Sequence, residues 1–422
     1  MGSKSDFPRV AVTGVGILCG LGIGREEVWA NAAAGASGAR TITRFDAGEH
    51  NVKIACEVPD FDPDRFVDTR SARRADPVSI LGVAAGRLAL EDADLDAGAL
   101  TPERSGAVVA SGTGGNMIRE RQYKVMRERG PDRISPFAVP HSIANTPSAL
   151  VSITFGLRGP VFSTTNACAA STDAVGTGGE IIRRGDADLV LAGGADSMVT
   201  PFWIAAFDAM RVLSHHNEDP AGAARPFDRS RDGFLIGEAG AVIVLERMDR
   251  ALERGARIIC ELAGYGNSAD AYHITDPDPT GEPQSWAMEA AIKDAAVAAE
   301  EVDYVNAHGG ASQPGDPAEV LAIQRALGTE AAAAVAVSAT KSMHGHCMGA
   351  AGAVEAALTA MAIEHQVLPP TLNLTDLDPD CEGVDHVVDT GRPSDVRVAL
   401  SASYGLGGHN AVICMTRPAE AA

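Results

Sequence analysis

Cys168 stands where a nucleophile could be activated. A polar, β-prone run at 163–165 leads into Asn166-Ala167-Cys168, and small residues then open a segment, 173–184, that we expect to be helical. At a junction of strand and helix, backbone N–H groups and the positive end of the helix dipole favour an anion. A thiolate there is a plausible nucleophile, and the cysteine's own N–H can help to bind an oxyanion. A small buried cysteine beside a tight turn explains this segment equally well.

Two histidines and a lysine fall on loops of the same glycine-rich kind. His308 follows a predicted strand, 302–307, and His346 lies on a loop that begins with Lys341, after a predicted strand at 334–338. A lone histidine after a strand is more often structural than catalytic. The combination of one cysteine with two histidines on such loops fits acyl transfer through a thioester better than other chemistries.

Other chemistries find less support in the sequence. His344, His346 and Cys347 include metal-ligand types, but a further ligand at a firm spacing is missing, so we expect no metal. The run Gly14-Val15-Gly16 resembles a dinucleotide fingerprint only loosely, because the third glycine is misplaced. The chain has neither a Gly-x-Ser-x-Gly elbow nor a phosphate-binding loop that ends in Lys-Ser or Lys-Thr.

The elements that position these residues repeat one theme in the two halves of the chain. Strands end in glycine-rich loops, helices lie between them, and a reactive residue precedes a helix of small residues. In this interpretation Cys168 in the first half corresponds to His346 in the second. The duplication predicts two α/β halves that face each other with their loops meeting at one site. The predicted strands are 9–13, 106–111, 187–194, 239–246, 257–266, 302–307, 334–338, 396–401 and 409–415, and the predicted helices are 77–94, 117–129, 173–184, 202–213, 284–299 and 349–364.

Length and composition limit the class of protein. The chain has 422 residues, 45% of them apolar, which suffices for two domains or two similar halves around a large core. Its seven cysteines show no close pairing pattern, so we expect reduced thiols and a cytoplasmic protein. No signal peptide is recognisable, and glycines interrupt the apolar run at 10–24, so we expect no membrane span. The formal net charge of −21 argues against nucleic-acid binding and requires an acidic partner to dock on a local basic patch.

Four motifs occur in the order typical of one enzyme family. They are Asn166-Ala167-Cys168, Val305-Asn306-Ala307-His308-Gly309, Lys341-Ser342-Met343-His344-Gly345-His346 and Gly405-Leu406-Gly407-Gly408. Together and in this order they are highly specific, and the resemblance extends from Val10 to Met415. The chain resembles the β-ketoacyl-ACP synthases of the elongating type II branch, which includes fatty-acid synthase II enzymes and the ketosynthase subunits of type II polyketide synthases.

This resemblance implies a thiolase-like α/β fold of duplicated halves in five layers (αβαβα). One half, 1–258, would carry the nucleophilic cysteine, and the other, 259–422, would carry both histidines. The implied reaction is a decarboxylative Claisen condensation of malonyl-ACP with an acyl group on Cys168, in fatty-acid or, preferentially, type II polyketide or polyene biosynthesis. No cofactor is expected, because the substrates travel on the phosphopantetheine of an acyl carrier protein and decarboxylation supplies the carbanion.

The resemblance also implies roles for individual residues. His308 and His346 would donate hydrogen bonds to the malonyl thioester oxygen and stabilise the enolate as carbon dioxide leaves. Lys341 and Glu355 would form a charged pair that orients the two histidines. The implied oxyanion hole consists of the N–H groups of Cys168 and Leu406, and the implied substrate-binding residues are Thr113, Phe207, Thr275, Ser312 and Leu406.

Three positions depart from the family pattern. Gly310 stands where the first of two threonines usually contacts the phosphopantetheine arm, with Ser312 in place of the second. Leu406 replaces a gating phenylalanine, and His344 replaces the more usual threonine or valine. These departures favour a specialised pathway over housekeeping fatty-acid synthesis.

The expected partners are an acyl carrier protein and a second chain of the same fold, in a homodimer or in a heterodimer with a homologous ketosynthase or chain-length-factor subunit. Carrier proteins of this kind are typically acidic, so exposed arginines are the docking candidates. Arginines that are merely solvated are the competing interpretation. The docking candidates are Arg70, Arg73, Arg74, Arg127, Arg129, Arg133 and Arg211.

Two alternative functions stay open. A non-catalytic chain-length-factor-like subunit would keep the fold but lack the active cysteine, whereas this chain has Cys168 and both histidines. A coenzyme-A-dependent condensing enzyme of the thiolase kind would pair its cysteine with one histidine plus a cysteine or asparagine, whereas this chain has two histidines and Lys341.

Overall fold

The computed structural model describes residues 7–418, except for the side chains of Arg70 and Ser71. Strands of the first half form a mixed sheet: β5 is parallel to β6 and β7, and β8 is antiparallel to β7 and β1. In spatial order these strands are β1 (Val10–Cys19), β8 (Glu238–Arg247), β7 (Leu189–Ser197), β5 (Ser105–Ala110) and β6 (Val161–Phe162).

The second half builds a similar arrangement beside it. β10 is parallel to β11 and β15, and β16 is antiparallel to β15 and β9. β1 and β9 join the two halves through the residue pairs Ala11–Glu261 and Val12–Cys260. In spatial order these strands are β9 (Cys260–Ala269), β16 (His409–Thr416), β15 (Val398–Gly405), β10 (Tyr304–Asn306), β11 (Ala336–Ser338) and β13 (Asp385–His386).

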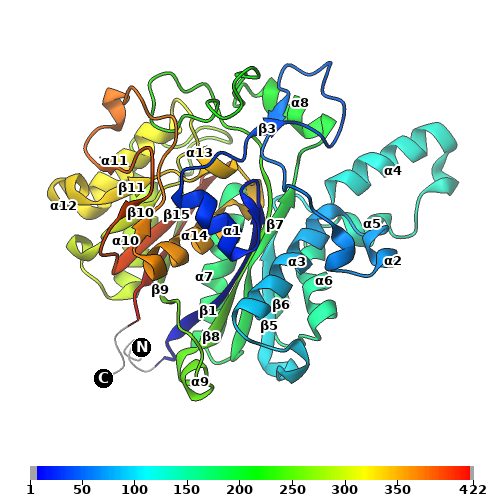
Figure 1. The fold of residues 1–422 in the computed structure, drawn as a ribbon, viewed down its shortest axis with the longest axis horizontal. Coiled ribbons are helices and arrows are strands. Elements are labelled where there is room, and N and C mark those ends of the chain that lie inside the picture. The colour runs from blue at the N-terminus through cyan, green and yellow to red at the C-terminus, as the bar shows by residue number, and fades with distance from the viewer. Residues whose placement is uncertain (1–6, 419–422) are drawn as a thin grey trace.

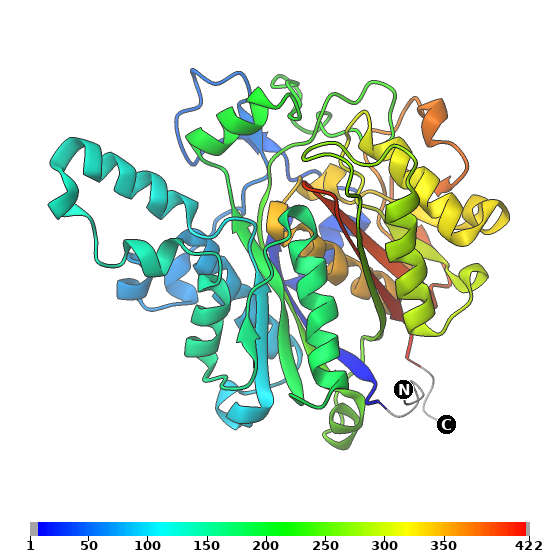
Figure 2. The ribbon, with the colours of Figure 1, turned by 180° about the vertical axis from the view of Figure 1, so that it is seen from behind.

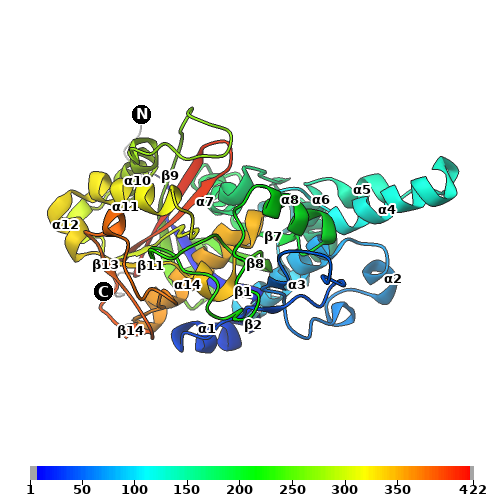
Figure 3. The same cartoon turned by 90° about the horizontal axis from the view of Figure 1, so that it is seen from above.

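Helices cover both outer faces and fill the space between the halves (Figure 3). The middle layer is α7 (Ala170–Arg183) with α14 (Ala351–His365), which contact strands of both halves. Figure 2 shows α7 between the strands of the first half and those of the second. The outer layers are α3 (Pro77–Asp92) with α6 (Thr146–Phe155), and α10 (Glu282–Ala295), α11 (Gly315–Leu327) and α12 (Thr329–Ala334). The protein therefore has the five-layered αβαβα thiolase-like fold that the sequence predicts.

Small residues let the middle helices approach the strands. Every residue of α14 from Ala351 to Ile363 is buried, including Glu355 and Thr359, as expected of a helix that packs against other elements on all sides. In α7, a Cβ added at Gly176 would lie 2.2 Å from the ring of Tyr265, so only glycine fits there. This packing fixes the N-terminal ends of both helices, which carry the candidate site.

The glycines that follow the first predicted strand lie inside β1, not in a loop after it. β1 continues through Gly14 and Gly16 to Cys19, so no loop of the dinucleotide-binding kind follows Thr13. A Cβ at Gly14 would lie 2.3 Å from the Ala89 carbonyl oxygen, and one at Gly16 would lie 1.9 Å from that of Ala85. Glycine is required because α3 packs directly on the strand.

Several other predicted boundaries also move. β7 runs through Gly193 and Gly194, β15 extends to Gly405, and α8 (Pro201–Ala209) ends before Leu213. α4 (Asn116–Arg129) and α5 (Ala138–Ser142) form an arm that projects from the first half (Figure 1). The remaining elements are α1 (Arg25–Ala33), α2 (Thr69–Ala72), α9 (Met248–Glu253), α13 (Lys341–His344), β2 (Gly22–Ile23), β3 (Arg40–Thr41), β4 (Ile54–Ala55), β12 (Val367–Leu368) and β14 (Arg392–Pro393). No helix within residues 7–418 is long and apolar enough to cross a membrane.

Candidate active site

Cys168 lies in a short 3-10 turn, Ala167–Ala169, that leads directly into α7. Ala167 adopts a φ of 48°, a left-handed conformation that costs free energy for a residue with a side chain and is typical of functional turns. Gly405 passes close by: a Cβ there would lie 3.1 Å from the backbone nitrogen of Cys168. The turn between β15 and β16 therefore closes over the cysteine only because residue 405 is glycine.

The thiol of Cys168 is neutral before it reacts. Burial raises its pKa to about 11, against the lowering effects of the Lys341 charge and of a hydrogen bond from the backbone of Leu406. That backbone group is one of the two proposed oxyanion-hole donors. The structure thus brings Leu406 to the cysteine, as the sequence predicts.

The internal repeat aligns differently from the prediction. A second 3-10 turn, Met348–Ala350, precedes α14 as the turn 167–169 precedes α7, and Met348 has a φ of 50° like Ala167. The residue equivalent to Cys168 is therefore Gly349, three residues after His346. The prediction that Cys168 corresponds to His346 is wrong because the histidine lies before the turn, not within it.

His308 follows β10 and is fixed by several polar groups. Its Nδ1 accepts the backbone N–H of Tyr404 over 3.3 Å and lies 3.3 Å from the ammonium of Lys341. Burial, the Lys341 charge and His346 hold the pKa of His308 well below its usual range. The ring is therefore neutral, with its proton on Nε2, where it is available as a hydrogen-bond donor.

His346 reaches the same state through different contacts. The backbone N–H of Met348 donates to its Nδ1 over 3.1 Å, and Phe234 packs edge-on with ring centroids 5.0 Å apart. Burial, Lys341 and His344 hold the pKa of His346 well below its usual range. The rings of His308 and His346 lie with centroids 5.4 Å apart and planes at 79°, so two neutral donors converge on one site.

Lys341 and Glu355 form the buried ion pair that the sequence predicts. Lys341 also donates to the carbonyl oxygen of His308 over 2.6 Å, so its hydrogen bonds to histidine both go to His308. Burial raises the pKa of Glu355 to about 7, although Lys341 and Ser403 oppose this shift. The pair therefore positions one histidine directly, whereas His346 is positioned by Met348 and Phe234.

Sequence reasoning missed two residues that support these side chains. Glu319 of α11 accepts the backbone N–H groups of His308 over 2.6 Å and of Gly309 over 2.8 Å, which fixes the loop after β10. Burial raises the pKa of this carboxyl to about 8. Phe234 ends the run Arg231-Asp232-Gly233-Phe234, which belongs to the family resemblance but to which the sequence assigned no role. Glu319 adjoins no recognisable motif, so the sequence gives no signal for it.

The predicted acyl-pocket residues have identifiable partners. The hydroxyl of Thr113 accepts a hydrogen bond from Asn116 over 2.7 Å, so it is already engaged within its own loop. Phe207 of α8 is buried, with its ring centroid 5.9 Å from that of Phe234. Because Phe234 contacts His346, the predicted pocket wall is continuous with the histidine.

The predicted arm-binding residues lie on two loops. Thr275 is exposed, and its loop meets the Leu406 turn where the N–H of Gly407 donates to the carbonyl oxygen of Ile274 over 2.9 Å. Ser312 instead has a local role, because its hydroxyl accepts the N–H of Gly315 at the start of α11 over 3.0 Å. Leu406 is 38% exposed at the tip of its turn.

The candidate metal ligands do not assemble. His344 and Cys347 are buried, and Nδ1 of His344 lies 3.8 Å from the Cys347 sulfur. Among residues 7–418, no group of three or more histidine, cysteine, aspartate or glutamate side chains is arranged to hold a metal ion.

The candidate docking arginines lie on several elements of the first half. Arg73 and Arg74 follow α2, Arg127 and Arg129 end α4, and all four are exposed. Arg74 lies over the ring of Phe137, 4.8 Å from its centroid. Arg133 ends the 3-10 turn after α4 and Arg211 follows α8, and both are exposed, whereas the side chain of Arg70 lies outside the described residues.

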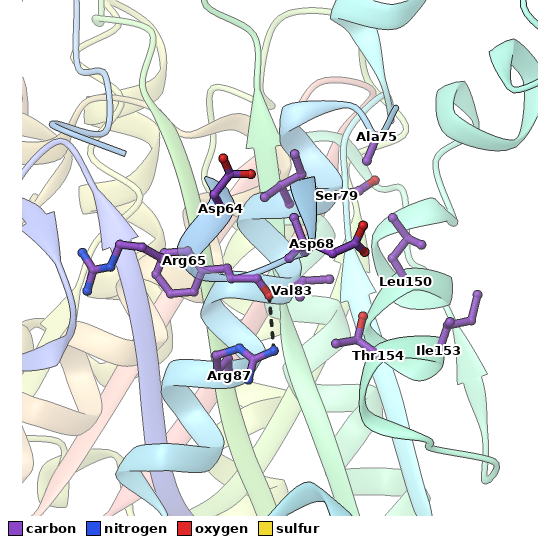
Figure 4. A pocket seen from close by; sticks show the side chains of 13 residues that line it. Asp64, Arg65, Asp68, Ala75, Ser79, Val83, Arg87, Leu150, Ile153 and Thr154 are labelled. Carbon is purple, nitrogen blue, oxygen red and sulfur yellow. Dashed lines mark hydrogen bonds between the residues drawn. The ribbon is translucent and has the colours of Figure 1, made fainter. Parts of the chain in front are cut away.

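A cavity of about 570 Å³ lies elsewhere, between α3, α6 and the loop 61–68 (Figure 4). Arg87 lines it and donates to the carbonyl oxygen of Phe66 over 3.2 Å, while Leu150 and Ile153 form the α6 side. None of the predicted catalytic residues lines it. This cavity is therefore not the candidate active site.

Comparisons with known proteins match both halves of the chain. The β-ketoacyl synthase N-terminal domain matches residues 8–251, and the β-ketoacyl synthase C-terminal domain matches residues 259–375. The 3-oxoacyl-[acyl-carrier-protein] synthase 2 of Synechocystis sp. is 40% identical over 409 residues, which cover 97% of this chain and 98% of that protein.

Two solved structures are similar over nearly the whole chain. The ishigamide ketosynthase/chain length factor has a TM-score of 0.91 at 35% identity and covers 98% of this chain and 100% of that one. A type II polyketide synthase acyl-carrier protein in complex with its ketosynthase bound to the hexaketide has a TM-score of 0.88 at 30% identity, with the same two coverages.

Proposed function

Because the chain belongs to the β-ketoacyl synthase family, and is thus an acyltransferase, we propose that it condenses an acyl group on Cys168 with a malonyl group carried by an acyl carrier protein. The observation that carries this proposal is that the rings of two neutral histidines lie with centroids 5.4 Å apart, and that Tyr404, which binds His308, is followed by Gly405, which packs against the backbone of Cys168.

The first step loads the enzyme. The sulfur of Cys168 attacks the thioester carbonyl of an acyl-carrier protein, and the N–H groups of Cys168 and Leu406 bind the oxyanion. The carbon–sulfur bond to phosphopantetheine then breaks, and the thiol proton of Cys168 ends on the departing thiolate. Since the thiol is neutral at rest, deprotonation must accompany the attack.

The second step generates the carbanion. The Nε2–H groups of His308 and His346 donate to the thioester oxygen of malonyl-carrier protein, and the carbon–carbon bond to the carboxylate breaks. The bond electrons form an enolate whose negative oxygen is held by the two donors. Neutral donors suit this step because they leave the malonyl carboxylate free to depart, whereas a charged imidazolium would also attract and retain it.

The third step forms the new carbon–carbon bond. The enolate carbon attacks the acyl carbonyl on Cys168, the oxyanion again lies at the N–H groups of residues 168 and 406, and the thioester bond to Cys168 breaks. The product is a β-ketoacyl group on the carrier protein, and the thiolate takes up a proton from solvent, which balances the one lost with the first carrier thiol. No metal or nicotinamide takes part, because loss of carbon dioxide supplies the carbanion.

We further propose that the acyl substrate belongs to a type II polyketide or polyene pathway. Support comes from the departures from the family pattern at Gly310 and Leu406 and from the similarity to two solved ketosynthase structures. The curated relatives, by contrast, are named 3-oxoacyl-[acyl-carrier-protein] synthase 2. Leucine lacks the flat ring of a phenylalanine gate, so the entrance at residue 406 admits a stiffer chain.

Competition between a saturated and a polyunsaturated acyl-carrier protein of equal length tests the pathway. We expect the wild type to prefer the polyunsaturated group and Leu406→Phe to reduce that preference by roughly tenfold, the lower end of the range for a methylene-sized change in an apolar pocket. The mass of the acyl group left on Cys168 shows which substrate was loaded. Equal loading of the two acyl groups by the wild type, with no change in the variant, would refute the proposed substrate class.

Two partners complete the proposal. An acyl carrier protein delivers both substrates, and a second chain of the same fold, either a copy or a homologue, pairs with the exposed edge of the first half. The edge strand β6, helix α6 and the nearby arm expose large apolar side chains, as an interface between chains requires. These are Tyr123, Phe137, Val139, Ile143, Ile153 and Phe162. Light scattering of the purified chain, alone and with candidate homologues, measures the assembly, and a monomer under all conditions would contradict it.

A further inference from the structure

The buried carboxyl group of Asp196 ties together two segments that lie beside the candidate site. It lies near the end of β7 and is completely buried. One of its oxygens, Oδ2, accepts the backbone N–H of Gly112 over 2.8 Å and that of Gly349 over 2.9 Å. Gly112 belongs to the first half and Gly349 to the second, so a single atom joins the two halves beside the reacting groups.

The first segment is the loop after β5 that carries Thr113. The hydroxyl of Ser111 lies 3.3 Å from Oδ1 of Asp196, and the same hydroxyl accepts the N–H of Gly114 over 2.9 Å. Together with the bond from Gly112, these contacts hold the whole loop 111–114 against Asp196. The position of Thr113, at the predicted mouth of the acyl pocket, therefore depends on this carboxylate.

The second segment is the turn that follows His346. Met348 donates its N–H to Nδ1 of His346, and the next residue, Gly349, donates its N–H to Asp196. The N–H groups of two consecutive residues thus bind the ring of His346 and the carboxyl group of Asp196. A displacement of Gly349 would move Met348, and with it the contact that keeps the His346 proton on Nε2.

Close packing leaves these segments little freedom. A Cβ at Gly349 would lie 2.1 Å from the nitrogen of Gly112 and 2.7 Å from Oδ2 of Asp196, and a Cβ at Gly112 would lie 3.0 Å from the same oxygen. Both positions must be glycine for the two segments to approach the carboxyl group of Asp196 together. Burial raises the pKa of Asp196 to about 7, and where this group is ionised its charge disfavours the thiolate of Cys168.

We infer that Asp196 is a positioning residue that couples the acyl-pocket loop 111–114 to the His346 turn. The coupling fixes the position of the acyl chain relative to that of the malonyl group. The inference rests on the proposed function and deepens it. Asp196 touches no substrate in this scheme and acts through Gly112, Gly349 and the charge that it presents to Cys168.

The test compares Asp196→Ala with Asp196→Asn, which keeps the volume and one acceptor oxygen but removes the charge. The matched control is Asp303→Ala, because Oδ2 of Asp303 also accepts two backbone N–H groups, from Arg397 over 2.7 Å and Val398 over 2.9 Å. Asp303 precedes β10, at the opposite end of that strand from His308. Each aspartate therefore accepts two backbone N–H groups through one oxygen, but only Asp196 adjoins the candidate active site.

For Asp196→Ala we expect kcat for malonyl decarboxylation to fall roughly ten- to hundredfold, as for misplacement of a catalytic group, with KM for the carrier protein unchanged. The range of acyl lengths that load onto Cys168 should broaden in the same variant. For Asp196→Asn the alkylation of Cys168 should reach its maximum at lower pH, because the opposing charge is gone. Asp303→Ala should change only thermal stability.

Wild-type decarboxylation and loading profiles in Asp196→Ala would overturn the inference, as would equal losses in Asp303→Ala. If the alanine variant does not fold, the asparagine variant decides, and an unshifted alkylation profile counts against the inference. Failure of the proposed function is a separate result, since the wild type itself would then release no carbon dioxide from malonyl-carrier protein.

Discussion

The backbone N–H of Met348 donates to Nδ1 of His346, and the backbone N–H of Tyr404 donates in the same way to Nδ1 of His308. Because each Nδ1 is an acceptor, each neutral ring carries its proton on Nε2. The two rings therefore offer hydrogen bonds to one substrate oxygen without carrying a charge.

This protonation state predicts how decarboxylation depends on pH. The pKa values of His308 and His346 lie well below 6.5, so the donating neutral form is already complete at pH 6 and persists as pH rises. Carbon dioxide release from malonyl-carrier protein without acyl donor should therefore not fall between pH 6 and pH 8. A rate that falls as pH rises, with a midpoint near 6.5, would show that a charged imidazolium is required.

The ion pair between Lys341 and Glu355 predicts a pH-dependent loss of stability. Lys341→Met leaves a buried carboxyl without its partner, which typically costs about 3–5 kcal/mol of unfolding free energy. The folded-state pKa of Glu355, already about 7 with Lys341 in place, should rise further. Because the folded variant then holds a proton that the unfolded chain releases above its ordinary value, the loss should be larger at pH 8 than at pH 6.

Urea unfolding at both pH values measures this difference. The double variant Lys341→Met with Glu355→Gln removes both charges, so it should recover most of the stability but not the decarboxylation, because His308 stays without its lysine contact. Equal destabilisation at the two pH values, or full activity in the double variant, would contradict this account.

The space beside His308 predicts unequal effects at two adjacent glycines. Gly310 has no left-handed φ, and a Cβ there would lie 3.4 Å from Nε2 of His308, which is an ordinary contact. Gly309 has a φ of 45°, and its Cβ would lie 2.2 Å from that of Ala339. Gly310→Thr should therefore fold normally and lower KM for the carrier protein by roughly two- to tenfold through one added hydrogen bond to the arm.

Gly309→Ala is the matched control and should lose several degrees in Tm, through both strain and overlap. Thermal melts and carrier-protein titrations separate the two effects. A large loss of stability in Gly310→Thr would show that residue 310 is glycine for packing, and an unchanged KM would show that its side chain does not reach the arm.

The exposed arginines predict where an acidic carrier protein docks. Charge reversal at Arg73 and Arg133 should raise KM for the carrier protein at low salt and leave the alkylation of Cys168 unchanged. Arg184→Glu serves as the control, because Arg184 is also exposed but lies at the far end of α7 from Cys168. An unchanged KM in the first two variants, or the same rise in the control, would exclude this surface.

The sequence predicts the five-layered fold and the groups that react, but not what holds them. Motif order identifies Cys168, His308 and His346 because each lies on a local turn with a recognisable pattern. Glu319 and Asp196 reach the site from elements whose sequences carry no such pattern, and their contacts are to backbone N–H groups, which every residue has. Long-range packing, not local sequence, places them.

Glycine shows the same limit in another way. From the sequence we predict that the first strand ends before Gly14 and Gly16, whereas both glycines lie inside β1, where α3 packs against it. A glycine that permits a turn and one that permits close packing are identical in sequence. The alignment of Cys168 with His346 failed for a related reason: the repeat is defined by the positive φ at Ala167 and Met348, which only the backbone reveals.

The most direct test of the central claim separates the two half-reactions. Wild type, Cys168→Ala, His308→Ala and His346→Ala are each incubated with acyl-carrier protein or with malonyl-carrier protein, and the mass of the intact enzyme and the carbon dioxide released are measured. We predict that Cys168→Ala gains no acyl mass yet still releases carbon dioxide. Each histidine variant should gain the acyl mass while its carbon dioxide release falls by about 10²–10³-fold. An acyl mass on Cys168→Ala, or undiminished carbon dioxide release from both histidine variants, would contradict the account.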